Sequence, residues 1–245
     1  MTTKPTILAT VLLMCAATTA QAQGSGFSWR GTLAAGKTIE VRVVLGDIDV
    51  VAATGTTVEV TAVKRARRSN EEDVKVEIVE STSGITICAM YPTPRRAREE
   101  NHCGVGEDYQ MSTNDNDVEV HFTVKVPRGV RLNAHTVNGD VHAEGLTADA
   151  EIGTVNGLID ATIGRADWTG TLEFRTVNGK ITLTAPASLS AEVDAQSVNG
   201  GVDSDFPITV RGRMERRHLR GTIGSGGRSL ELETVNGEIE IRKGA

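Results

Sequence analysis

The stretch Thr176-Val177-Asn178-Gly179 decides the fold, because it recurs, with one Thr-to-Ser change, five times in the second half of the chain. The copies are Thr136-Val137-Asn138-Gly139, Thr154-Val155-Asn156-Gly157, Thr176-Val177-Asn178-Gly179, Ser197-Val198-Asn199-Gly200 and Thr234-Val235-Asn236-Gly237. They begin 18, 22, 21 and 37 residues apart, and the last interval contains an insertion over residues 205–227. Such periodicity is the signature of a fold built from repeated units, here of about 20 residues.

Both sides of the motif carry the alternation of apolar and polar residues that is typical of a β-strand. Leu172 and Phe174 alternate with charged residues before the third copy, and Ile181 and Leu183 alternate with polar residues after it. The fifth copy has the same flanks. Each repeat is therefore predicted to be a strand, an Asn-Gly corner and a second strand.

Two architectures fit this unit. Asn-Gly between strands is a strong signal for an antiparallel hairpin with a type I′ turn, whereas a β-solenoid stacks equivalent strands in parallel. We favour the all-β parallel solenoid, because the apolar residue two places after each Gly also recurs, at Val141, Ile159, Ile181, Val202 and Ile239. In such a stack Asp160 and Thr182 lie on adjacent strands, about 4.8 Å apart; in a meander the distance is about 10 Å.

The N-terminal half contains a degenerate copy of the repeat, Val43 to Val50. Further strands are expected at Val74 to Val79, Gly84 to Met90 and Val118 to Val126, separated by polar loops over residues 64–73 and 92–117. The predicted organisation is a signal peptide over 1–22, an N-terminal β region over 23–130 that consists of degenerate repeats or a cap, and a β-solenoid repeat domain over 131–245.

The first 22 residues resemble a secretory signal peptide. Lys4 precedes an apolar run from Ile7 to Ala17, and Ala20-Gln21-Ala22 matches an Ala-x-Ala cleavage site. Met14 disfavours the alternative, a lipid anchor on Cys15, because that modification needs a small residue before the cysteine. No other stretch approaches the roughly 20 apolar residues of a membrane-spanning helix, so no transmembrane segment is expected. The chain is expected in the periplasm, on the cell surface or outside the cell.

Export leaves two cysteines, Cys88 and Cys103, which are expected to form a structural disulfide in an oxidising compartment. The alternative is a redox-active pair, but the sequence separation is far from a Cys-x-x-Cys spacing. The bond would tie the polar loop that contains Cys103 to a strand.

Composition and local charge limit the possible partners. The formal net charge is −6, which disfavours binding to nucleic acid. The insertion is locally basic, and Arg213, Arg216 and Arg217 are candidates for contact with an acidic ligand. The alternative is a charged loop that contacts solvent.

The sequence predicts no catalytic, cofactor or metal site. His102, His135 and His142 have no usual zinc-ligand spacing, and the chain lacks the common hydrolase and phosphate-loop motifs. Asp140, Asp160 and Asp203 follow corners and are candidate carboxylates for polysaccharide cleavage, which requires a close pair. The alternative is a hydrated acidic face.

The repeats resemble the bacterial putative-adhesin family of exported β-solenoid domains of unknown function. The resemblance also rests on Val126-Pro127-Arg128-Gly129-Val130 and on Gly221 to Gly227 followed by Leu230 to Gly237. It implies a right-handed β-solenoid and brings no catalytic residues. We therefore expect a non-enzymatic interaction or structural module of the cell envelope whose partner is an unknown protein or polymer. The alternative is a polysaccharide-active enzyme on the same scaffold.

Cleavage of the exported protein is predicted to occur after Ala22, because the small residues at this position match signal-peptidase specificity. Intact-mass analysis should therefore find a chain that begins at Gln23. A chain that begins at a lipid-modified Cys15 would contradict this prediction.

Overall fold

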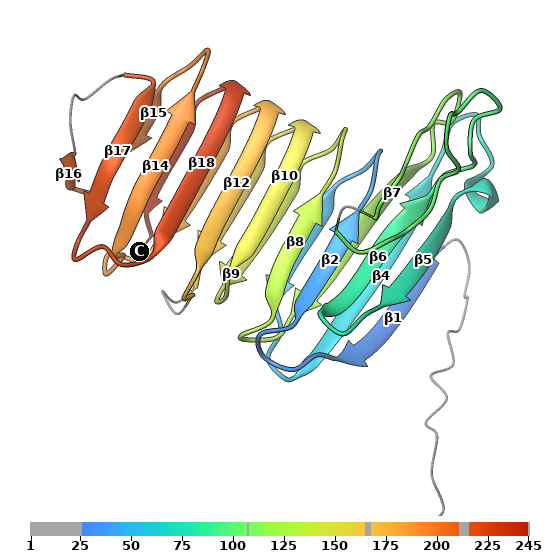
Figure 1. The fold of residues 1–245 in the computed structure, drawn as a ribbon, viewed down its shortest axis with the longest axis horizontal. Helices are drawn as coiled ribbons and strands as arrows, with labels where there is room; N and C mark the ends of the chain where they lie inside the picture. The colour runs from blue at the N-terminus through green and yellow to red at the C-terminus, as the bar shows by residue number, and fades with distance from the viewer. Residues whose placement is uncertain (1–25, 107, 165–167, 211–215, 245) are drawn as a thin grey trace, which may run out of the picture.

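The computed structural model describes residues 26–106, 108–164, 168–210 and 216–244 (Figure 1). The predicted signal peptide and Arg213 lie outside these residues. The described residues form β-strands, apart from loops and one short 3-10 helix, Glu71–Asp73. No helix in the described ranges is long and apolar enough to span a membrane.

The strands of the described residues form two sheets. One has nine strands, in the spatial order β1 (Gly26–Thr32), β4 (Thr57–Arg65), β7 (Glu119–Val126), β3 (Ile48–Ala52), β9 (Val141–Leu146), β11 (Ile159–Ile163), β13 (Ile181–Ala185), β19 (Ile239–Lys243) and β15 (Val202–Ser204). The other has ten, in the order β16 (Ile208–Val210), β17 (His218–Ile223), β14 (Ala191–Ser197), β18 (Ser229–Asn236), β12 (Thr171–Asn178), β10 (Ala150–Asn156), β8 (Arg131–His135), β2 (Thr38–Arg42), β6 (Gly84–Met90) and β5 (Lys75–Glu80).

Each repeat forms a coil with one strand in each sheet, and successive coils pair in parallel. Asp160 and Thr182 are direct partners on β11 and β13, as the parallel stack predicts. The hairpin alternative is wrong for these motifs. None of their Asn or Gly residues is among the described residues with positive φ, which a type I′ turn would require.

The sheets as a whole are mixed, which corrects the expectation of a purely parallel solenoid. At one end β4 pairs antiparallel with β1 and β7, and β5 pairs antiparallel with β6. At the other end β17 pairs antiparallel with β14 and β16. Antiparallel neighbours need only short connections, so hairpins can close both ends of the stack. The right-handed winding of the coils stays a prediction.

The spatial order of the coils differs from their order in the chain. The coil β18–β19, which carries the fifth motif, lies between β12–β13 and β14–β15, which carry the third and fourth motifs. At the other end β2–β3 lies between β6–β7 and β8–β9. Figure 1 shows β18 between β14 and β12, and β2 between β8 and β6. The N-terminal strands thus share both sheets with the repeats.

The core lies between the two sheets and consists of aliphatic rows. One row joins the apolar residues that follow the corners; Val202, at its C-terminal end, is half-buried, and the members within the stack are at most 1% exposed. The members within the stack are Ile48, Val141, Ile159, Ile181 and Ile239. The recurrence of these residues in the sequence follows from this stacking, because each coil must present the same shape to both neighbours.

Alanine at Gly179 is predicted to destabilise the fold by about 3 kcal/mol or more, as is typical of severe steric strain. A Cβ at this position would overlap the carbonyl group of Gly157 on the neighbouring coil. The matched control is Gly55→Ala, since Gly55 is exposed and has no atom within 4 Å of the added carbon. Chemical denaturation measures both variants, and equal stabilities would refute the close-approach argument.

Candidate functional site

The five motif asparagines form a hydrogen-bonded ladder along one edge of the stack. Four of the five side-chain amides donate to the side-chain oxygen of the neighbouring asparagine, and all five residues are exposed. The bonds join Asn156 to Asn138, Asn178 to Asn156, Asn236 to Asn178 and Asn199 to Asn236, at 2.8, 2.8, 2.7 and 2.9 Å. Each amide keeps a second N–H, and each oxygen a second lone pair, for other partners.

The hydroxyl of each motif Thr or Ser is buried and donates to the carbonyl oxygen of a glycine on the adjacent coil. The bonds run from Thr136 to Gly46, Thr154 to Gly139, Thr176 to Gly157, Thr234 to Gly179 and Ser197 to Gly237, at 2.8–3.0 Å. The corner residues thus connect each coil to the next, while the adjacent valines are 37–44% exposed at Val137, Val155, Val177 and Val198. The Val and Asn residues of the five motifs together form an uncharged surface, the corner edge.

The outer face of the ten-stranded sheet carries four carboxylates in register. Glu151, Glu173, Glu231 and Asp194 are successive partners on β10, β12, β18 and β14. Burial raises the pKa of Glu173, the Arg175 guanidinium lowers it, and the charges of Glu151, Glu231 and Glu233 raise it further. Like charges on adjacent strands repel, so this row costs stability unless cations compensate for it.

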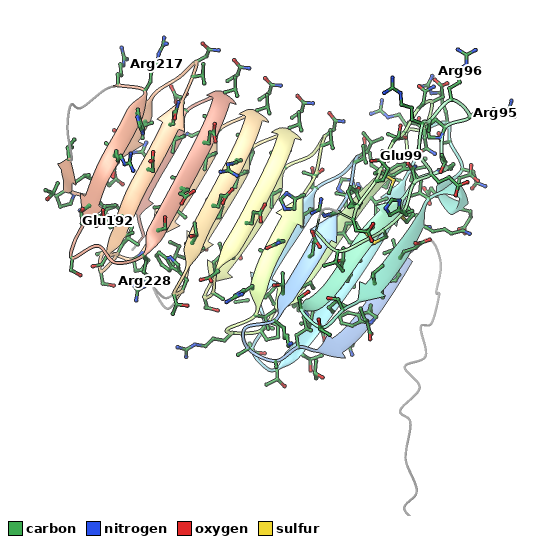
Figure 2. All side chains as sticks on the ribbon, in the orientation of Figure 1. Arg95, Arg96, Glu99, Glu192, Arg217 and Arg228 are labelled. Carbon is green, nitrogen blue, oxygen red and sulfur yellow. A yellow bond between two sulfur atoms is a disulfide. The ribbon has the colours of Figure 1, made fainter. Side chains whose placement is uncertain are left out.

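An open groove of about 520 Å³ lies over this face at the C-terminal end of the stack. It is lined by Arg175, Glu192, Val193, Asp194, Gln196, Arg220, Ser229, Glu231, Leu232 and Glu233. Figure 2 shows Glu192 and Arg228 at this end of the molecule. The groove contains hydrogen-bond donors and acceptors and side chains of both positive and negative charge. It therefore suits a polar polymer or a polar protein surface.

Internal pairs hold the groove side chains in place. Arg175 forms ion pairs with Glu173 and Glu233, and Asp194 accepts a bond of 2.8 Å from His218. Asp194 also lies 3.6 Å from the Arg220 guanidinium. Glu231 accepts from the hydroxyl of Ser229 at 3.0 Å. Such pairing keeps the side chains in fixed positions, which favours binding.

The three aspartates considered for polysaccharide cleavage do not form a pair. Asp140 accepts a 2.8 Å bond from the backbone N–H of Leu158. Asp160 lies on β11 and Asp203 on β15, with β13 and β19 between them. Asp203 instead forms an ion pair of 2.6 Å with Arg242. The inserted coil β18–β19 accounts for part of this separation.

The histidines considered for zinc are also separate. His102 lies in the long loop beside Asp108, His135 on β8 near Glu151, and His142 on β9 in the other sheet. Within the described ranges no three His, Cys, Asp or Glu residues are placed to hold a metal ion.

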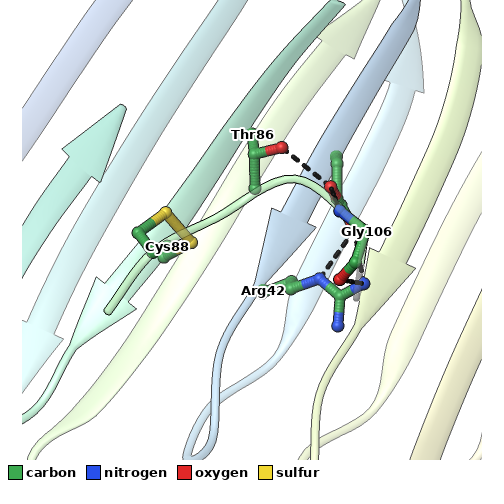
Figure 3. The surroundings of a disulfide bond; sticks show 6 residues. Arg42, Thr86, Cys88 and Gly106 are labelled. Carbon is green, nitrogen blue, oxygen red and sulfur yellow. Dashed lines mark hydrogen bonds and ion pairs between the residues drawn. A yellow bond between two sulfur atoms is a disulfide. The ribbon is translucent and has the colours of Figure 1, made fainter. Parts of the chain in front are cut away.

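The Cys88–Cys103 disulfide joins β6 to the long loop, and this loop covers part of the ten-stranded sheet (Figure 3). Beneath it Glu40 is 4% exposed and forms an ion pair of 2.5 Å with Arg42. Thr86 donates its hydroxyl to Glu40 at 2.7 Å, and the N–H of Gly106 donates at 3.3 Å. Sequence reasoning missed this cluster, because Glu40 has the same alternating position as any outward-facing strand residue.

The basic insertion is only partly described. Arg216 and Arg217 are exposed, and their backbone oxygens accept bonds from Val202 and Ser197. Figure 2 shows Arg217 projecting at one end of the molecule. The backbone thus fixes the turn while both arginine side chains extend into solvent.

Lowering the pH should destabilise the wild-type protein relative to His135→Gln. Burial lowers the pKa of His135, as does the charge of Arg42, while Glu151 and Glu40 oppose this shift. As the pH falls below the ordinary histidine value, the unfolded chain therefore binds a proton that the folded chain resists. At about pH 8 the histidine is neutral in both the folded and the unfolded chain. The stability difference between the two variants measured by denaturation at this pH is therefore the reference for the same measurement at about pH 5.5. A stability difference that is independent of pH would contradict this prediction.

One solved structure has a fold similar to this architecture. A putative cell adhesion protein from Clostridium sporogenes has a similar fold, with a TM-score of 0.60 and 13% identity over 89% of this chain and 100% of that chain. A putative adhesin from Bacteroides fragilis matches with a TM-score of 0.26 and 10% identity, over 90% of this chain and 98% of that one. No curated protein matches. Residues 36–242 match the Toastrack DUF4097 family, and the chain therefore belongs to this family.

Proposed function

We propose that the chain is an exported module of the cell envelope that binds a protein or polymer, or has a structural role, without catalysing a reaction. The main observation in support is the charged groove across β12, β18, β14 and β17, about 520 Å³ in volume. The Clostridium neighbour, which is described as a putative cell adhesion protein, agrees with this role at the level of the fold.

The stack suits binding because it separates stability from recognition. Inward-facing residues fill the core, and corner residues connect the coils. The outward-facing residues on the strands therefore contribute less to the stability of the fold. Strands in register present these outward side chains at intervals of about 4.8 Å. A rigid surface of this kind loses little conformational entropy when it binds an extended partner.

The exposed arginines next to the groove extend the proposal to acidic partners. Arg216 and Arg217 follow the undescribed part of the insertion, and Arg220 lines the groove itself. An acidic or phosphate-rich envelope polymer could contact these arginines through charge-assisted hydrogen bonds. Such attraction weakens as salt concentration rises.

The alternative function, a polysaccharide-active enzyme, has one specific observation in its favour. Glu173 has a raised pKa and lies beside Glu231 in the sheet. Two carboxyl groups, one of them protonated, are the usual catalytic pair of glycosidases. Arg175 forms an ion pair with Glu173, however, and opposes protonation. Loss of glycan cleavage in Glu173→Gln would favour the enzyme, whereas absence of cleavage by the wild-type chain favours the binding module.

The proposal is tested with the mature chain as bait in a pull-down from envelope extract. Retention of a defined protein or polymer is expected, and a lower yield should follow when Glu192 and Arg220 in the groove are both changed to Ala. Retention that is unaffected by the groove changes would contradict this location for binding.

Changing Arg213, Arg216 and Arg217 to Ser should weaken envelope association in a salt-dependent way and leave thermal stability unchanged, because exposed charges contribute little to folding. The matched control changes three arginines elsewhere in the chain, the exposed Arg95, Arg96 and Arg98, to Ser. Figure 2 shows Arg95 and Arg96 at the opposite end of the molecule from Arg217. Both variants lose the same net charge. Equal association of the two variants with the envelope would therefore mean that the insertion contacts only solvent.

A further inference from the structure

We propose that the place occupied by β18–β19, between β12–β13 and β14–β15, also accepts the same coil from a second copy of the chain. Two copies would then exchange residues 228–244 and form a dimer. This inference goes beyond the proposed function and does not depend on it, because it concerns how the chain recognises itself.

The order of the coils is the first reason. In the described structure, β18–β19 follows both β12–β13 and β14–β15 in the chain but lies between them in space. The other displaced coil, β2–β3, precedes both of its neighbours, so later coils can add to its two sides. At the C-terminal end, a coil must instead enter between two coils that come before it. In the described sheets β14–β15 pairs with β18–β19 and not with β12–β13, so the coil joins two walls that do not otherwise pair, and the place between them is called the C-terminal slot.

The walls of the slot bind the coil through repeated, equivalent contacts. Thr234 donates to the carbonyl oxygen of Gly179 at 2.9 Å, and Ser197 on the other wall donates to that of Gly237 at 2.8 Å. Asn236 lies in the asparagine ladder between the two walls. All of these bonds join the coil to a wall, so a coil from another copy would form the same bonds.

Apolar and charged contacts also cross from the coil to both walls. The inward residues Leu230, Leu232, Ile239 and Ile241 are at most 1% exposed. Glu240 forms an ion pair of 2.6 Å with Lys180 on one wall, and Arg242 forms one of 2.6 Å with Asp203 on the other. A slot left empty would expose this apolar surface, so it must be filled by the chain itself or by a partner.

The connection to the coil is a turn that could act as a hinge. Gly224, Gly226 and Gly227 all have positive φ, at 57°, 73° and 98°, and they join β17 to β18. Exchange requires this turn to open, while the contacts within the slot stay the same. Because the same contacts form within one copy or between two, the protein concentration during folding decides between monomer and exchanged dimer.

The test uses two differently tagged copies of the mature chain, one with Thr182→Cys and the other with Glu240→Cys. These positions are direct partners on β13 and β19. Adjacent strands bring them about 4.8 Å apart, within the Cα separation of a disulfide. The copies are mixed, unfolded in denaturant with the native disulfide intact, refolded at high protein concentration and oxidised. A disulfide between the tags then reports a coil from one copy in the slot of the other.

The matched control uses copies with Asp160→Cys and Thr182→Cys, which are direct partners on coils that stack in chain order. Cross-linked heterodimer should exceed the control several-fold and should increase with protein concentration during refolding. A single chain with both Thr182→Cys and Glu240→Cys should form the internal disulfide, which shows that the variant folds and that the pair can be bridged. Equal cross-linking in test and control, or none in the test at any concentration, would overturn the proposal.

Discussion

The structure depends on one contact that each of the five motif corners repeats, the close approach of a glycine to the carbonyl group of a neighbouring glycine. A Cβ at Gly139, Gly157, Gly179, Gly200 or Gly237 would overlap the carbonyl group of the adjacent corner. The hydroxyl of the Thr or Ser in the same motif donates to that same carbonyl oxygen. The glycine thus leaves space for the carbonyl oxygen, and the Thr or Ser hydroxyl donates a hydrogen bond to it. This explains why both residues recur and why Ser can replace Thr.

The first corner lacks this pair and uses a different solution. Its Thr position is Val43 and its Asn position is Leu45, so neither side chain can donate along the stack. The hydroxyl of Tyr91, which is 2% exposed, lies there instead and donates to the carbonyl oxygen of Val118 at 2.9 Å. Burial raises the pKa of Tyr91, so the hydroxyl remains a donor. A buried aromatic residue that directly follows β6 therefore completes the corner where the motif is incomplete.

Much of the fold could be predicted from residues that every coil repeats, but the order of the coils could not. The fourth and fifth motifs present the same hydroxyl, glycine and asparagine, so either could lie next to Asn178. In the chain the two motifs are separated by the hairpin β16–β17. The position of this hairpin depends on contacts of the insertion, which cannot be predicted from the repeat pattern. The candidate site was missed for a related reason. Glu173 and Glu231 have ordinary strand positions in the sequence. They become direct neighbours only because β18 lies next to β12 in space, although β14 comes between them in the chain.

The interchangeability of the coils strengthens the stack and also makes it self-complementary. Both displaced coils are paired on each side, so segments near the two ends of the described chain are held within the sheets. The outermost strands at the C-terminal end, β15 and β16, have three residues each, and short edge strands offer little backbone for unwanted pairing. The chain thus limits self-association at its edges by keeping them short. It has no such protection inside the stack, because a slot that is specific for one of its own coils is equally specific for the same coil of another copy.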